Sequence, residues 1–285
     1  MVPMTDGPSI PPPTWMIGCG NMGGAIVDGW RSAGFDLGGL TVIRPSGRAV
    51  EGVRTVTALA EAGAAPKAVI LAMKPQQLDA VAPVLRTLLS AKTVVISMLA
   101  GVEAATLCTR FPGAAAVVRA MPNIPVSIRR GVIALFSHDA NDAQRQLVAD
   151  LFQPLGFAPW LDDETKFGAI GSVAGAGPAY VARFIAALAK SGEQAGLSNE
   201  MASIVALETV LGTAWLGASG NDDMAEIARR VASPNGTTEA GLAVLDRDSV
   251  LDELIAVTMA AADRREAELA EEAKAGSLAA AADLS

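Results

Sequence analysis

Several kinds of residue are scarce in this chain of 285 residues, and each scarcity excludes a class of protein. It has two cysteines, Cys19 and Cys108, which excludes a disulfide-held secreted scaffold and favours a reducing compartment. Basic residues number 22 against 30 acidic ones, and the formal charge of −8 argues against a nucleic-acid surface. Aromatic residues make up only 4%, whereas 51% of residues are hydrophobic, so we expect a sizeable core of small side chains.

Long apolar runs are also missing. We find no uninterrupted stretch of the ~18 residues that a membrane span needs, so we expect no membrane partner. Residues 1–13 are rich in proline and lack an apolar signal segment, which predicts a disordered lead-in and a cytoplasmic protein. The single histidine, His138, lies in a polar turn away from every motif described below. We interpret it as a surface residue and predict no metal site.

The most informative stretch is residues 18–23, which read Gly-Cys-Gly-Asn-Met-Gly. An apolar strand at residues 15–17 precedes it, and a helical run at residues 25–33 follows. The pattern G-x-G-x-x-G between a strand and a helix is the fingerprint of a dinucleotide site.

Each of the three glycines of this fingerprint meets a separate structural requirement. Gly18 permits the tight turn, Gly20 lets the backbone approach a pyrophosphate, and Gly23 lets the helix lie close to the strand. Free N–H groups where the helix starts, at Asn21 and Met22, then bind the phosphates.

The end of the second strand, residues 41–43, bears on the choice of cofactor. NAD sites place an acidic residue there to bind the ribose hydroxyls. This chain has Arg44, Ser46 and Arg48 instead, which neutralise and hydrogen-bond a 2′-phosphate. We therefore predict NADP(H), with NAD(H) as the alternative cofactor and a solvated basic loop as the alternative interpretation.

Strands and helices alternate up to residue 162. Further strands are predicted at residues 68–73, 93–97, 115–119 and 131–136, with a last edge strand at 158–161. Intervening helices are predicted at residues 77–89, 102–110 and 141–152. This alternation predicts an α/β domain at residues 14–162, a doubly wound Rossmann-type parallel sheet. Its ligand crevice lies beyond the carboxyl ends of the strands.

No further strand is evident after residue 162. Helices are predicted at residues 165–191, 199–216, 222–231, 238–244 and 250–270, which gives a helical domain at 163–272 and a flexible tail at 273–285. The first of these helices contains Gly168, Gly171, Gly175, Gly177 and Pro178, although glycine and proline weaken helices. They indicate close approach there, by another helix or by a ligand. The abundance of glycine and alanine predicts at least a homodimer.

Five blocks of residues resemble the pyrroline-5-carboxylate reductase family, which makes proline with NADPH. They run in that family's order and cover the chain from about residue 15 to residue 270: 17–23, 72–76, 119–125, 175–180 and 233–241. The resemblance implies a nucleotide-binding domain followed by a helical dimerisation domain.

The resemblance also implies the site residues. Around the nicotinamide and its ribose it places Lys74, Pro75, Met121, Pro122 and Asn123. We add Met73 and Ala100 to the cofactor site, because they lie at the carboxyl ends of the predicted strands 68–73 and 93–97. For the substrate, a cyclic imino acid, the resemblance implies Ser233, Asn235, Gly236, Thr237 and Thr238, and we add Gly177 because its helix is expected to allow close approach. The loop 233–238 opens a helix with N–H groups and hydroxyls, which suits a carboxylate, although alone it also reads as an ordinary helix cap.

The resemblance suggests a reaction in which NADPH delivers a hydride to the imine carbon. Thr238 would hold the ring nitrogen, directly or through a water. The imine can take its proton from water, so the protein mainly has to orient the ring and exclude water.

Some positions depart from the family pattern, mostly on the helical side. Ala174 and Ala176 replace two serines, Gly168 and Gly171 stand where Asp and Thr are common, and Glu208 and Asn235 replace Gln and Gly. A reductase of another cyclic imine is therefore an alternative. A β-hydroxyacid dehydrogenase is a weaker one, because Val181 stands where its lysine would be needed. A non-catalytic NADP(H)-binding protein is the third.

Overall fold

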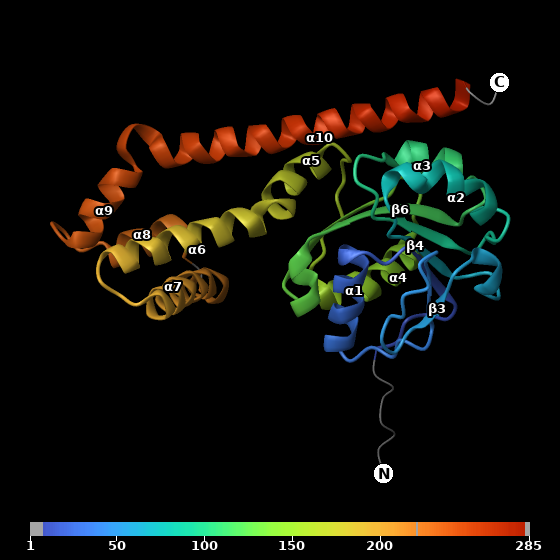
Figure 1. Ribbon diagram of the computed structural model, residues 1–285, viewed down its shortest axis with the longest axis horizontal. Helices are drawn as coiled ribbons and strands as arrows, with labels where there is room; N and C mark the ends of the chain where they lie inside the picture. Colours follow the sequence, from blue (N-terminus) through green and yellow to red (C-terminus); the bar gives the residue numbers. More distant parts are fainter. Residues whose placement is uncertain (1–7, 221, 283–285) are drawn as a thin grey trace, which may run out of the picture. The chain divides into compact units, whose positions relative to one another are not determined.

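The computed structural model describes residues 8–220 and 222–282 (Figure 1). The chain divides into two compact units, which we describe separately. The first comprises the described residues up to Gly175 together with those from Asp263 on, and the second comprises Ala176–Ala262. The predicted domain boundary at residue 162 therefore falls 13 residues before the end of the first unit's main segment.

The first unit is built on one eight-stranded sheet with the strand order β3-β2-β1-β4-β5-β6-β7-β8. Its strands are β1 (Thr14–Ile17), β2 (Leu40–Ile43), β3 (Arg54–Val56), β4 (Ala68–Leu71), β5 (Val94–Ser97), β6 (Ala116–Pro122), β7 (Gly131–Phe136) and β8 (Gly156–Phe157). All neighbouring pairs are parallel except β6 and β7. Four of the strands, β1, β2, β4 and β5, are buried along their whole length, as in sheets covered on both faces.

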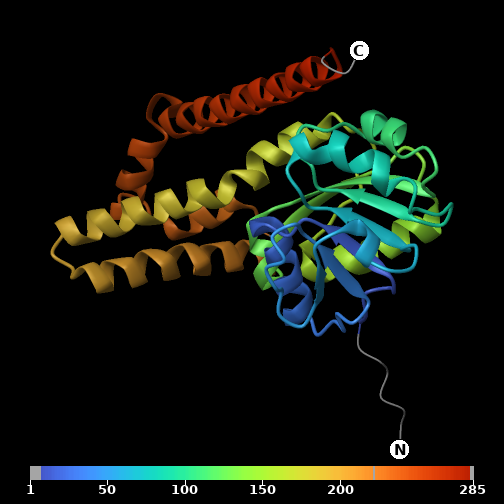
Figure 2. The ribbon, with the colours of Figure 1, turned by 45° about the vertical axis from the view of Figure 1, so that its right-hand side comes forward.

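Helices cover both faces of this sheet, as Figure 2 shows. Residues of α1 (Asn21–Ser32) and α4 (Asp142–Phe152) pack in one core with Met16 of β1. Residues of α2 (Leu78–Leu85) and α3 (Ala104–Arg110) pack in a second core with its neighbours Trp15 and Ile17. Because successive strand side chains point to opposite faces, one strand serves both cores, and the doubly wound architecture is confirmed.

Four local predictions in this unit differ from the structure. Residues 8–13 are packed rather than disordered: Ile10 is buried, and its N–H lies 3.1 Å from the Asp36 carbonyl oxygen. The prediction for residues 1–7 lies outside the described residues. Strand β3 was missed, because its three residues are only partly buried. The last edge strand lies at β8 instead of residues 158–161, where only Trp160 forms a bridge, and the helix predicted at 77–89 ends at Leu85.

The segment after β8 is interrupted where one long helix was predicted. It consists of α5 (Lys166–Ile170), a π-helical turn (Gly171–Gly175) and α6 (Gly177–Gln194). An added Cβ at Gly168, Gly175 or Gly177 would meet no described atom within 4 Å. The predicted close approach at these glycines therefore does not come from this chain's described residues.

The second unit is helical, as predicted. It contains α6, α7 (Asn199–Ser219), α8 (Met224–Val231), α9 (Thr237–Leu245) and the first part of α10 (Val250–Ala282). Helices α6 and α7 pack through the small residues Ala189, Ala202 and Ala206. Helix α10 continues to Ala282, where the sequence predicted a flexible tail from residue 273.

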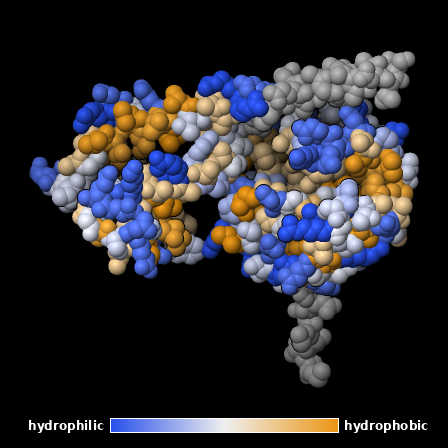
Figure 3. Space-filling view, viewed as in Figure 1, coloured by the Kyte–Doolittle hydropathy of each residue, from blue (hydrophilic) through white to orange (hydrophobic). Residues whose placement is uncertain are grey.

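Large apolar side chains lie on the surface of the second unit, seen in orange in Figure 3. Examples are Phe184 on α6 and Leu211 and Trp215 on α7, each at least half exposed. By length and composition alone, Lys166–Gln194 and α7 pass the test for a membrane span, although charged residues interrupt the apolar run of each. Only 11% of each apolar window is buried within the single chain, so most of the apolar surface of both helices is exposed.

Candidate active site

The glycine loop between β1 and α1 has the geometry of a dinucleotide fingerprint. Gly18 has a φ of +82°, and a Cβ added there would lie 2.9 Å from the Ala72 carbonyl oxygen. A Cβ at Gly23 would lie 3.3 Å from the Met16 sulfur, so the helix lies close to the strand. At Gly20, by contrast, a Cβ would meet no described atom within 4 Å, which leaves the backbone open to a ligand. The three roles predicted for these glycines match the surroundings of each.

The start of α1 fits the pyrophosphate of a dinucleotide. Gly20 precedes the helix and supplies no side-chain cap, and the first turn contains no acidic residue. The N–H groups of the first turn, including those of Asn21 and Met22, therefore lack a side-chain cap at the positive end of the helix dipole. An anion beside Gly20 would be bound by them.

A basic loop follows β2, the strand next to β1 in the sheet. The Arg44 Nε donates a hydrogen bond to the Ser46 Oγ over 3.0 Å, and the Arg48 backbone N–H contacts the same oxygen at 3.4 Å. The Arg44 N–H bonds to the Val56 carbonyl oxygen of β3, so the missed strand helps to place this loop. Two guanidinium groups and one hydroxyl thus share a short exposed turn, as recognition of a phosphate requires.

A cavity of about 950 Å³ lies at the carboxyl ends of β5 and β6. Its lining comes from the loop after β5, the end of β6, Met22 of α1, the start of α5 and two residues of α10. Of the predicted cofactor residues, it brings together Met22, Ala100, Met121 and Pro122. Met73, Lys74, Pro75 and Asn123 do not line it.

Asn123 is buried, and its side chain is engaged by the protein itself. Its Oδ1 accepts the Val132 N–H at 2.8 Å, and its Nδ2 donates to the Ala174 carbonyl oxygen at 2.9 Å. The amide therefore joins β7 to the π-helical turn. For Asn123 this geometry favours a structural role of the side chain over the predicted direct contact with a cofactor.

Four charged residues line the cavity, and none was among the predicted site residues: Glu103, Arg119, Glu164 and Asp263. Arg119 on β6 and Glu164, just before α5, form an ion pair of 2.6 Å, and their side chains are 12% and 20% exposed. The guanidinium also lies 4.4 Å from the centre of the Phe167 ring. An arginine inside an otherwise apolar strand was the available signal for this pair.

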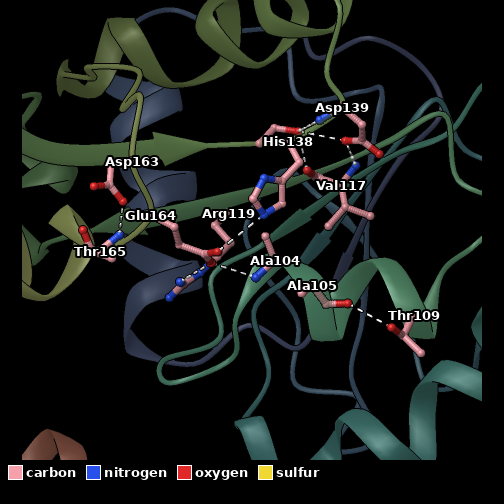
Figure 4. Close-up of polar contacts among 11 residues, drawn as sticks. Ala104, Ala105, Thr109, Val117, Arg119, His138, Asp139, Asp163, Glu164 and Thr165 are labelled. Carbon is pink, nitrogen blue, oxygen red and sulfur yellow. Dashed lines mark hydrogen bonds and ion pairs between the residues drawn. The ribbon is translucent and has the colours of Figure 1, made fainter.

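His138 lies close to this pair rather than away from every functional element. Figure 4 shows its ring directed toward Glu164, with 3.8 Å between His138 Nε2 and Glu164 Oε2. The ring packs edge-on against Phe136, and 55% of the side chain is exposed. The exposure agrees with the prediction of a surface residue, and the contact with Glu164 was not predicted.

Both cysteines are free, which agrees with the prediction that they form no disulfide. Cys19 lies inside the glycine loop, and burial raises the pKa of its thiol. Cys108 on α3 is half-buried, and burial raises the pKa of its thiol as well. Neither thiol is therefore an activated nucleophile.

The predicted substrate loop belongs to the second unit. It is a tight turn in which the Gly236 N–H bonds to the Ser233 carbonyl oxygen at 2.9 Å, and Asn235 has a φ of +57°. Helix α9 begins at Thr237, and Gly236 before it supplies no side-chain cap. The Asn235 N–H is taken by the Glu239 carboxylate at 2.7 Å, and the N–H groups of the first turn of α9, including those of Thr237 and Thr238, have no side-chain cap from Gly236.

The glycine loop, the basic loop after β2 and the cavity at the carboxyl ends of the strands define an NADP-dependent oxidoreductase. Two family models match the chain, one in the nucleotide-binding unit and one mainly in the helical region. Residues 15–101 match the family described as NADP oxidoreductase coenzyme F420-dependent, and residues 164–269 match pyrroline-5-carboxylate reductase dimerisation. The helical region is thus a dimerisation domain, and the prediction of a homo-oligomer is confirmed in this form.

Known proteins match nearly the whole chain. A pyrroline-5-carboxylate reductase of Pseudomonas aeruginosa is 35% identical over 263 residues, which are 90% of this chain and 96% of that protein. The structure of a pyrroline-5-carboxylate reductase from Coxiella burnetii is similar with a TM-score of 0.81 at 31% identity, covering 90% of this chain and 98% of that one. A Plasmodium falciparum pyrroline carboxylate reductase with NADP bound shares the fold, with a TM-score of 0.80 at 22% identity and the same coverage. The chain belongs to the pyrroline-5-carboxylate reductase family.

Proposed function

We propose that this protein reduces the cyclic imine 1-pyrroline-5-carboxylate to L-proline, with NADPH as the reductant. The observation that carries the proposal is the match to the Pseudomonas aeruginosa reductase over 90% of the chain, which leaves neither unit without a counterpart. NADPH, when bound, supplies a hydride, and a proton from water completes the reduction of the C=N bond to CH–NH. The residues of the chain bind the cofactor and the substrate, orient them and exclude water.

At the nucleotide end, we assign the pyrophosphate to the backbone of residues 18–23. Arg44, Ser46 and Arg48 hold the 2′-phosphate, because they provide opposite charge and donors within one turn. Ala100, Met121 and Pro122 provide apolar lining that excludes water from the reacting ring. Lys74 is exposed, and the assignment of it and of Met73 and Pro75 to the cofactor rests on the family resemblance and on their place directly after β4.

At the substrate end, the loop 233–238 receives the carboxylate of the imino acid. The N–H groups of Thr237 and Thr238 at the start of α9 act together with the Ser233 hydroxyl, without any formal positive charge. The Glu239 carboxylate takes the Asn235 backbone N–H, so this N–H is not available to the substrate carboxylate. The Thr238 hydroxyl holds the ring nitrogen. Gly177, at the first position of α6, leaves room for the ring.

The test follows NADPH absorbance with the purified protein and racemic pyrroline-5-carboxylate, with NADH in a parallel reaction. We expect rapid oxidation of NADPH and consumption of half of the racemate. A Thr238→Ala variant should still bind NADPH but should reduce the imine more slowly, by roughly 10- to 100-fold if one transition-state hydrogen bond is lost. Tight NADPH binding without oxidation would reject the proposal.

A second candidate substrate is another cyclic imine, such as a six-membered homologue. Ala174 and Ala176 carry no hydroxyl, so the side chains there cannot donate hydrogen bonds to a ligand as serines do. A higher kcat/KM for the six-membered imine than for pyrroline-5-carboxylate would favour this candidate. We expect the five-membered ring to be preferred.

The assembly and location that we propose are a cytoplasmic homodimer or larger homo-oligomer. The exposed apolar side chains of α6 and α7 are the surface that such an assembly buries, rather than a membrane-facing one. Sedimentation of the purified protein without detergent tests this directly. A monodisperse dimer or larger species supports the proposal, and dependence on detergent would reject it.

A further inference from the structure

The Glu164 carboxylate contacts three elements that are distant in sequence, as Figure 4 shows. Its Oε1 accepts the backbone N–H of Ala104 at 2.7 Å and lies 2.6 Å from the Arg119 Nη1. Its Oε2 lies 3.8 Å from the His138 Nε2. One side chain thus joins the start of α3, the strand β6 and the turn after β7 to the segment that leads into α5.

The contact with Ala104 completes the start of α3. Glu103, which precedes this helix, supplies no side-chain cap. The residue that accepts the first N–H of the helix is instead Glu164, which is 60 residues further along the chain. Because Ala104 is fully buried in the presence of Glu164, loss of the carboxylate would remove the acceptor of this N–H and weaken the start of the helix.

The contact with Arg119 determines what this arginine does in the cavity. Its guanidinium lies between the Glu164 carboxylate and the face of the Phe167 ring. Phe167 is buried and packs edge-on against Phe136 of β7. The positive charge is therefore already compensated, and Arg119 is held in place rather than offered to an anionic ligand.

These contacts surround the cavity at the carboxyl ends of β5 and β6. The loop of residues 98–103 leads from β5 to Ala104 and forms one wall, and Met121 and Pro122 follow Arg119 on β6 to form another. We infer that Glu164 is a positioning residue for imine reduction. It fixes the loop 98–103 through Ala104 and the end of β6 through Arg119, and thereby shapes the wall against which the reacting ring of the cofactor lies.

This inference rests on the proposed function for the identity of the reacting ring, but the contacts of Glu164 can be tested without turnover. The first experiment measures hydrogen exchange of the full-length protein without ligand. In Glu164→Ala the amides of residues 98–104 should exchange faster, by about tenfold for a lost hydrogen bond worth ~1.4 kcal/mol. Exchange in α4, on the opposite face of the sheet, should not change. Unchanged exchange of residues 98–104 would overturn the inference.

The second experiment separates positioning from loss of fold. Glu164→Gln keeps an oxygen for the Ala104 N–H but removes the charge that holds Arg119. We expect kcat to fall roughly tenfold or more from misplaced reacting groups, while one NADPH still binds per chain with little change in affinity. The phosphates are bound at the other end of the cofactor, which is why binding should persist. Parallel loss of kcat and of NADPH stoichiometry would mean unfolding and would overturn the inference, as would a kcat equal to the wild type.

The matched control is Asp79→Asn. Asp79 forms an ion pair of 2.8 Å with Arg110, at the opposite end of the same helix α3. This variant also removes one acidic partner of an arginine, but the side chains of this ion pair are more exposed, at 39% for Arg110 and 50% for Asp79. It should leave kcat and the exchange of residues 98–104 unchanged. If the wild type itself does not reduce the imine, the proposed function fails, and the exchange experiment still decides the role of Glu164.

Discussion

Substitution by alanine should affect different properties of the protein at two glycines of the same loop. Gly18→Ala adds a Cβ that would lie 2.9 Å from three backbone atoms of Ala72 and Met73, at a residue with a φ of +82°. Gly20→Ala adds a Cβ into open space, at a residue with a φ of −84°. The first change should therefore destabilise the fold, and the second should affect binding of the cofactor.

The magnitudes follow from these surroundings. For Gly18→Ala, the left-handed conformation costs about 1–2 kcal/mol and the backbone crowding about 1–3 kcal/mol. The sum of ~2–5 kcal/mol is a large part of the free energy of unfolding of a typical domain, which is ~5–15 kcal/mol. For Gly20→Ala, the free energy of unfolding should change by less than ~1 kcal/mol, the usual range for a residue that precedes a helix. Crowding of the pyrophosphate should raise the Kd for NADPH roughly 10- to 100-fold.

The assays are guanidinium unfolding for stability and a fluorescence titration for the Kd of NADPH. Gly34→Ala is the matched control, because Gly34 also has a positive φ, +79°, but no described atom lies within 4 Å of an added Cβ. It should cost only the ~1–2 kcal/mol of the left-handed backbone. Equal losses for Gly18→Ala and Gly34→Ala would refute the crowding argument. An unchanged Kd for Gly20→Ala would refute the placement of the pyrophosphate.

The remaining predictions concern the cofactor, a helix cap, a thiol and the assembly. Arg44→Asp should weaken NADPH far more than NADH in the same titration, and equal losses would place the 2′-phosphate elsewhere. Asn141→Ala removes the acceptor of the Gln144 N–H at the start of α4, so the free energy of unfolding should fall by ~1 kcal/mol, measured by urea unfolding. Burial raises the pKa of the Cys19 thiol, so its alkylation should be slower than that of glutathione and should accelerate only in alkaline solution. Sedimentation at micromolar concentration should show a dimer or larger species, and a compact monomer would contradict the assignment of the apolar helices to an interface.

The strongest local patterns were enough to predict the nucleotide-binding part of the fold. Apolar runs of four to six residues became buried strands, and the prediction of a helix at 141–152 agrees with α4 because Asn141 and Gln144 form a reciprocal cap there. Weak patterns failed. The three residues of β3 are only partly buried, and Lys166–Gln194 is interrupted by a π-helical turn that no periodicity indicates.

The candidate site likewise has parts that local sequence predicts and parts that it does not. The glycine and basic loops are local, because each is one strand end followed by a turn, and the residues that matter lie within a few positions of one another. Glu164 and Ala104 are 60 residues apart, and Arg119 meets Glu164 across 45 residues. Nothing in the local pattern of either segment pairs them.

By itself, then, the sequence determined where strands and helices alternate, where the helical region begins, and which loop can accept a dinucleotide. These properties depend on neighbouring residues and on the steric freedom of glycine. The tertiary structure decided that β7 runs antiparallel to β6. It also decided that the Asn123 amide is hydrogen-bonded within the protein, and that Glu164 accepts the first N–H of α3, a helix to which it does not belong. Each of these depends on groups that the packing of the sheet brings together. A buried polar group needs a hydrogen-bond partner, and only the tertiary structure decides which group lies close enough to be that partner.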